Sequence, residues 1–290
     1  YIIKIIINKK IIKLNKMLIS KPNKKESSNS LTDCYNGLID NFQKKKKMHD
    51  RNFKLKMSSN SLQASVDILT SPRETFDALK DKKGWSWTPF GLVIASSVAL
   101  FLYYFSVVDF EWMIEQMLEK MAAQGDMSGE ELQATQEFMT KTSMTWSTTL
   151  GSAIGIIVIN AIMAVYFNLI TKVSSPNELT FTAWYGFSWW VSMPLVVSCL
   201  LSGLVIIFSS AGMVSLEDLS PTSLGFLADQ SSPWFGFFSG INLFSLWSIA
   251  LGAIGLSSWL GLASKKTFII AASPTLVIYT CWALYIGFSG

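Results

Sequence analysis

The chain has 290 residues, half of them apolar, and its mean hydropathy is +0.35. The apolar residues form continuous runs of the roughly 20 residues that a membrane-spanning helix needs, which excludes a soluble globular domain and, without alternation, a β-barrel. The net charge of +4 does not indicate nucleic-acid binding, because residues 1–56 hold 15 of the 24 Lys and Arg against four acids, whereas the rest holds nine bases and 16 acids.

Residues 1–56 differ in composition from the rest of the chain. They are rich in Ile, Lys and Asn, and lysines interrupt the apolar stretch YIIKIIINKKIIKL, which therefore fits neither a membrane span nor a signal peptide. We expect a disordered basic tail that arises from upstream DNA read in frame, with the native start at Met57. The alternative is a genuine tail that lies on anionic lipid.

Few residues of the sequence could support catalysis. The single histidine, His49, lies in the basic tail, and Cys34, Cys199 and Cys281 form no CxxC pair. The apolar runs contain no charged residue, and no metal-ligand spacing is present. The sequence therefore predicts a protein that is not an enzyme and that uses no metal or cofactor.

Residues 57–88 are expected to form a cytoplasmic helical lead-in at the membrane interface. Ser71 followed by Pro72 is a typical helix start, because proline suits the first helical position. Trp85 and Trp87 then stand where the chain enters the bilayer, since indole rings prefer the interface.

Five apolar runs follow and predict an all-α, polytopic membrane domain over residues 89–290. The expected transmembrane helices cover about residues 89–108, 148–170, 184–208, 237–262 and 268–288.

Four residues inside these runs are candidate polar or hinge positions. Asn160 and Asn242 are amides in apolar surroundings, and the expected role of such a residue is an interhelical hydrogen bond of about 0.6–2 kcal/mol. Contact with a substrate is the alternative. Pro194 and Pro274 are expected to bend the third and fifth spans.

Basic residues stand in alternate loops. Lys82 and Lys83 precede the first span, Lys172 follows the second, and Lys265 and Lys266 separate the fourth from the fifth. Basic residues in short loops remain in the cytoplasm during insertion. We therefore expect these lysines to set the topology, with a cytoplasmic N-terminus and a C-terminus on the outer, periplasmic side.

The acidic loop over residues 109–147 predicts a helical hairpin on the outer side. Met113, Met117 and Met121 recur at helical spacing and form one apolar face, and residues 125–127 suit a turn. Methionine-rich faces adapt to different surfaces. We interpret this face as a candidate partner-binding site, with packing on the second helix of the hairpin as the alternative.

Loose motifs in the lead-in and in the third span carry a family resemblance. The residues concerned are Ile68, Leu69, Pro72, Phe76, Leu79, Trp85, Pro89, Tyr185, Gly186 and Pro194. With the five spans, they resemble the bacterial branch of the Yip family, the Ypt/Rab-interacting-protein domain. The resemblance implies a multi-pass protein of the plasma (inner) membrane. Eukaryotic relatives are linked to small GTPases through an acidic, proline-containing motif that this sequence lacks, so a GTPase partner is not supported.

Two functions remain open on these grounds. The first is a non-enzymatic membrane protein that contacts the lipid bilayer and associates with a membrane-protein partner, or with copies of itself, in membrane organisation or protein/lipid traffic. The alternative is a small permease or transporter subunit with a polar path near Asn160 and Asn242. A polar cleft around Asn160 would favour the permease, and an Asn160 bonded inside a packed core would favour the first.

Overall fold

The computed structural model describes residues 60–82, 84–124, 129–209 and 212–289. The expectations for the basic tail, for Lys83 and for the turn of the hairpin lie outside these residues. The described part contains no strand. Its helices are α3 (Ser61–Thr70), α4 (Pro72–Leu79), α5 (Trp87–Val107), α6 (Phe110–Gln124), α7 (Gly129–Phe138), α8 (Lys141–Ser174), α9 (Phe181–Val191), α10 (Pro194–Phe208), α11 (Phe235–Gly240), α12 (Leu243–Leu260) and α13 (Ser264–Ser289), with short 3-10 turns η1 (Glu217–Leu219) and η2 (Gly225–Leu227).

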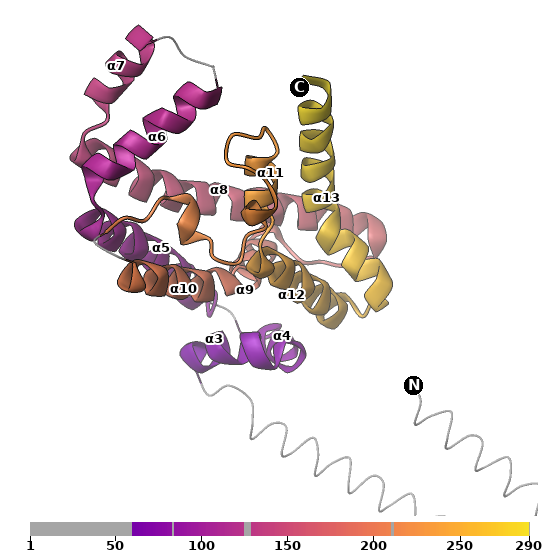
Figure 1. Ribbon diagram of the computed structural model, residues 1–290. Coiled ribbons are helices and arrows are strands. Elements are labelled where there is room, and N and C mark those ends of the chain that lie inside the picture. The colour runs from indigo at the N-terminus through magenta and orange to yellow at the C-terminus, as the bar shows by residue number, and fades with distance from the viewer. Residues whose placement is uncertain (1–59, 83, 125–128, 210–211, 290) are drawn as a thin grey trace, which may run out of the picture. The chain divides into compact units, whose positions relative to one another are not determined.

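Five helical stretches are long and apolar enough to cross a membrane, which confirms the prediction of an all-α, five-span protein. They are α5, α8, the pair α9–α10 over Phe181–Phe208, α12, and α13 over Ser264–Phe288 (Figure 1). The second is longer than expected, because α8 already begins at Lys141 within the predicted loop. The predicted hairpin is also present, as α6 and α7.

The fourth span begins later than the apolar run indicates. The run from Phe237 reads as continuous, but the chain forms the separate helix α11 and starts again at Leu243. Asn242 is the reason, because it is extended and its side-chain Oδ1 accepts a hydrogen bond from the backbone N–H of Ser245 at 2.9 Å. A residue predicted inside the span is therefore its N-cap.

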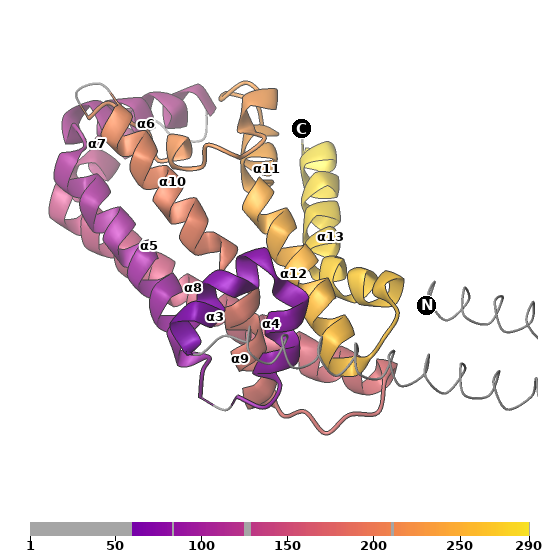
Figure 2. The same cartoon turned by 90° about the horizontal axis from the view of Figure 1, so that it is seen from below.

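Proline positions mark irregularities in two spans. Pro194 begins α10, so the third span is broken between α9 and α10 at Ser192 and Met193. Pro274 lies inside α13, and Figures 1 and 2 show that this helix bends along its length. Proline lacks the backbone N–H that would continue the helical ladder, which accounts for the break.

The lead-in helix α4 packs against the C-terminal end of α12 (Figure 2). The Trp259 indole donates from Nε1 to the Phe76 carbonyl oxygen at 3.0 Å, and the Lys80 ammonium donates to the Trp259 carbonyl oxygen at 3.1 Å. Asp77 accepts a hydrogen bond from the Ser258 hydroxyl. These polar contacts hold the lead-in on the bundle at the end where α12 finishes.

An aromatic cluster fills the interior between α4 and the spans. Phe187 of α9 lies at its centre, with its ring centroid 5.2 Å from that of Phe76, 5.4 Å from that of Phe167 and 5.0 Å from that of Trp259. Gly255 of α12 makes this packing possible, because a Cβ atom there would lie 2.5 Å from the Phe187 ring. The burial of these rings is the main apolar stabilisation at this end of the bundle.

A second apolar cluster lies at the opposite end, where α5 meets α6 and α10. Its buried members are Tyr104, Phe105, Val108, Met113, Ile114, Ile206, Val214 and Leu219. This cluster joins the base of the hairpin to the ends of two spans and to the segment before η1. We call this the hairpin end, and we call the end that carries Lys82, Lys172, Lys265 and Lys266 the lysine-bearing end.

Candidate functional site

A polar cleft of about 610 Å³ lies between α8, α9–α10, α12 and α13, and both predicted asparagines line it. No Asp, Glu, Lys or Arg is found among the described residues that line it. Its polar groups are amides and hydroxyls alone, which suits an uncharged or internally neutral guest. They belong to Ser152, Asn160, Ser192, Ser198, Ser220, Asn242, Ser245, Ser248 and Thr275.

Asn160 forms part of the cleft wall and also bonds two helices together. Its side chain is only 3% exposed. Its Nδ2 donates to the Ile156 carbonyl oxygen of its own helix at 2.9 Å, and its Oδ1 accepts from the Ser192 hydroxyl at 3.0 Å. The Ser188 hydroxyl donates to the Asn160 backbone oxygen at 3.2 Å. Asn160 therefore ties the middle of α8 to the end of α9, directly before the break at Pro194.

Asn242 lies at the opposite limit of this cleft, where α12 begins. It pairs in an isolated antiparallel bridge with Ser223 of the preceding loop. The cleft therefore extends from the start of α12, at the hairpin end, to the middle of α8.

Aromatic side chains close the cleft on its other side. Phe167 lines the cleft, is almost completely buried and contacts Phe187. Phe187 in turn contacts Phe76 of the lead-in. A continuous stack of rings therefore separates the polar cleft from α4.

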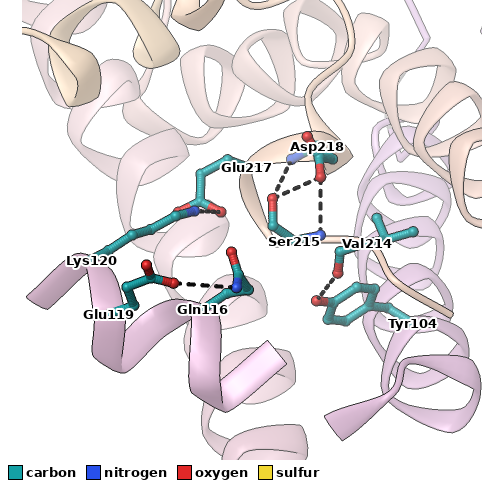
Figure 3. A network of polar contacts seen from close by, with 8 residues as sticks. All are labelled: Tyr104, Gln116, Glu119, Lys120, Val214, Ser215, Glu217 and Asp218. Carbon is teal, nitrogen blue, oxygen red and sulfur yellow. Dashed lines mark hydrogen bonds and ion pairs between the residues drawn. The ribbon is translucent and has the colours of Figure 1, made fainter. Parts of the chain in front are cut away.

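The structure divides the three methionines of the hairpin between two environments. Met113 is buried in the cluster at the hairpin end, whereas Met117 and Met121 are half-buried. The same helix carries Lys120, whose ammonium lies 3.2 Å from a Glu217 carboxylate oxygen (Figure 3). The base of the hairpin is thus fixed, and the two later methionines remain partly accessible.

A polar network supports this base from the loop that follows α10 (Figure 3). The buried Tyr104 hydroxyl donates to the Val214 carbonyl oxygen at 2.8 Å. The Asp218 carboxylate accepts from both the backbone N–H and the hydroxyl of Ser215, at 3.1 and 2.8 Å. Residues 214–218 are therefore held against α5 and α6.

The lysines that are predicted to set the topology have different local environments. The Lys82 ammonium lies 5.1 Å from the centre of the Trp85 ring, and Lys172 and Lys265 are exposed. Lys266 donates from Nζ to the carbonyl oxygen of Ser174, the last residue of α8, at 2.8 Å. Lys266 and Lys80 each bind a carbonyl at a helix C-terminus, where a cation is favourable. Sequence reasoning did not identify these two contacts, because they join segments far apart in the chain.

A metal site is not evident in the described part of the chain. Among its residues, no group of three or more His, Cys, Asp or Glu side chains could hold a metal ion. Cys199 and Cys281 are free thiols.

Comparison with known proteins identifies the family. A family model, the Yip1 domain, matches residues 66–285. Neither the curated proteins nor the solved structures gave a match. The matched range begins within α3 and ends within α13, and it therefore includes four spans and most of the fifth, together with the hairpin and the polar cleft. The chain belongs to the Yip1-domain family of membrane proteins.

Proposed function

We propose that this protein is a non-enzymatic, multi-pass protein of the plasma (inner) membrane that acts by associating with a membrane-protein partner in membrane organisation or protein/lipid traffic. The observation that carries this proposal is the form of the α6–α7 hairpin. Its base is buried, but Met117 and Met121 remain half-exposed.

The buried base gives the hairpin a defined direction. Burying Met113 and Ile114 stabilises this contact by about 1.5–3 kcal/mol each. The ion pair of Lys120 with Glu217 is partly exposed and adds at most about 1 kcal/mol. A face that is already ordered loses little conformational freedom on binding, which favours association.

The side chains of the hairpin also fit this role. Met117 and Met121 offer flexible, polarisable groups that can repack against different partners. Glu111, Glu115 and Glu119 are exposed on the same helix, but the helical spacing places them on the side opposite the methionines. We therefore expect a partner whose contact surface contains an apolar patch that meets the methionines, with no role for the glutamates on the opposite side.

Substitution of the half-exposed methionines tests the proposal. The Met117→Gln/Met121→Gln variant should reach the membrane at the normal level and lose a partner that cross-links to the unchanged protein. Glu115→Gln serves as the control for loss of an exposed side chain on α6, and it should retain the partner. If the double variant disappears from the membrane instead, the methionine face is part of the core and the hairpin is not the partner site.

A second candidate function, a small permease or transporter subunit, is favoured by the polar cleft. Asn160 and Asn242 line this cleft together with seven hydroxyl side chains. In a variant without native cysteines, Ser248→Cys should react with a membrane-impermeant thiol reagent if water fills the cleft. Leu276→Cys is the control, because Leu276 is 62% exposed on the outside of α13, where lipid is expected. If the thiol of Ser248→Cys does not react, the permease function is excluded and Asn160 keeps a packing role.

A further inference from the structure

A separate cleft of about 420 Å³ lies at the lysine-bearing end, between the turn that joins α4 to α5 and the start of α9. We call it the interfacial cleft, because α5 begins there at Trp87 and α9 begins there at Phe181. Unlike the cleft around Asn160, it carries cationic side chains. The lining residues that matter here are Lys80, Lys82, Ser86, Trp87, Tyr185 and Trp189.

The charge of the interfacial cleft is unbalanced. Lys80 and Lys82 line it, and no Asp or Glu is found among its described lining residues. Lys80 uses one N–H for the Trp259 carbonyl oxygen and keeps two for another acceptor. Lys82 lies over the Trp85 ring. Asp81 stands between the two lysines in sequence and is exposed, but it is not part of the lining.

An aromatic wall faces these lysines and contains an unused donor. Trp189 is 2% exposed, and its ring packs edge-on against Phe90 at 4.8 Å and Tyr185 at 5.8 Å between centroids. Its indole Nε1 is buried and has no hydrogen-bond partner among the residues that the structure describes. Buried polar groups normally find a partner, so this N–H is a donor that an acceptor entering the cleft could use.

A glycine keeps the turn close to this wall. A Cβ atom on Gly186 would lie 2.5 Å from the Ser86 hydroxyl oxygen, so a larger residue would push the turn away from α9. Ser86 and Gly186 both line the interfacial cleft. The close contact therefore fixes the distance between the cationic turn and the aromatic wall.

We propose that the interfacial cleft binds the headgroup of an anionic phospholipid. The beginnings of two spans place it at the depth of lipid headgroups, where Trp and Tyr are also favourable. Phosphate oxygens accept charge-assisted hydrogen bonds from lysine, and the Trp189 N–H can donate to a phosphate or ester oxygen. The aromatic rings suit the glycerol and the first carbons of the acyl chains. This binding does not depend on the partner proposed for the hairpin.

Lipid binding to the purified full-length chain tests this proposal. In detergent, dioleoyl phosphatidylglycerol should bind, as measured by native mass spectrometry, and should raise the melting temperature, whereas dioleoyl phosphatidylcholine should do neither. The Lys80→Gln/Lys82→Gln variant should bind phosphatidylglycerol roughly tenfold more weakly. Equal binding of the two lipids would contradict a site for anionic lipid.

Matched variants separate a built site from general surface charge. Lys172→Gln/Lys265→Gln removes the same charge from the same end, but neither residue lines the cleft, so binding should not change. If it weakens binding as much as Lys80→Gln/Lys82→Gln does, the effect is surface charge and the proposal is wrong. Soluble glycerol phosphate that binds as tightly as the lipid would also overturn it, because the site would then serve a free anion.

Two single variants keep the proposal testable if the Lys80→Gln/Lys82→Gln variant misfolds. Lys82→Gln leaves the bond between Lys80 and Trp259 intact and should still weaken lipid binding several-fold. Trp189→Phe keeps an aromatic ring and removes only the unused N–H. It should weaken phosphatidylglycerol binding about threefold without lowering the melting temperature of the lipid-free protein. Unchanged lipid binding in both single variants would overturn the assignment of the lipid to this cleft.

Discussion

Single residues decide how closely the segments of this protein approach one another. Gly186 accommodates Ser86, and Gly255 accommodates Phe187 and Phe76. The family resemblance includes the aromatic–glycine pair at Tyr185 and Gly186. The reason for the glycine is its close contact with Ser86, which sequence patterns cannot show. Gly255 carries no local signal, because nothing in the sequence reveals which rings lie beside it.

Gly255→Ala is expected to destabilise the protein, since the new Cβ would lie 2.5 Å from Phe187 and 2.9 Å from Phe76. Overpacking of this kind costs about 1–3 kcal/mol. Gly151→Ala provides the control, because nothing lies within 4 Å of its Cβ position. Thermal unfolding in detergent should show a lower melting temperature for Gly255→Ala alone. Equal melting temperatures would mean that the aromatic cluster can shift to accept the methyl group.

At the scale of elements, the apolar runs predict the spans but not their limits. The existence of five spans follows from run length, because the bilayer sets a minimum for each helix. The boundary between α11 and α12 does not follow from run length, since hydropathy is unchanged across it. Only Asn242, which caps the start of α12, marks this boundary. The break at Pro194 was predictable from proline chemistry, but its link to Asn160 through Ser192 depends on tertiary packing.

The lead-in is expected to stay on the bundle chiefly through one apolar side chain. Phe76 is completely buried against Phe187 and Gly255, and truncation of a buried Phe to Ala costs about 3–5 kcal/mol. Phe76→Ala should therefore release α4 from α12 and expose the turn before α5 to protease.

The control for this experiment is Val66→Ala, because Val66 is 58% exposed on α3 and should not affect attachment. Limited proteolysis followed by mass measurement reports cleavage in residues 80–86. Trp259→Phe should have a smaller effect, since it removes only the hydrogen bond to the Phe76 carbonyl, which contributes about 0.5–1.5 kcal/mol. Comparable cleavage in Val66→Ala and Phe76→Ala would show that Phe76 does not anchor the lead-in.

In the molecule as a whole, charged side chains are distributed unevenly along the direction of the spans. The lysine-bearing end includes Lys172, Lys265 and Lys266, whereas α6 and η1 at the hairpin end carry acidic side chains. This asymmetry could be predicted from the sequence, because loop charges need no knowledge of packing. The polar cleft and the interfacial cleft could not, since their walls combine residues from several spans and loops. The contact of Lys80 with Trp259, for example, joins residues 179 positions apart.

The charge asymmetry predicts the orientation of the protein in the membrane. A reporter fused after Lys172 should be cytoplasmic, and one fused at Gly290 should be periplasmic, because basic residues in short loops resist translocation. Lys265→Glu/Lys266→Glu should reduce the periplasmic signal at Gly290, since the loop between α12 and α13 would then lose its positive charge.

Part of that effect could come from the lost bond between Lys266 and Ser174, so Lys266→Gln, which removes this bond and leaves Lys265, is the matched control. A full periplasmic signal from the double variant would show that these lysines do not set the topology. A cytoplasmic Gly290 in the unaltered protein would contradict the orientation assigned to all five spans.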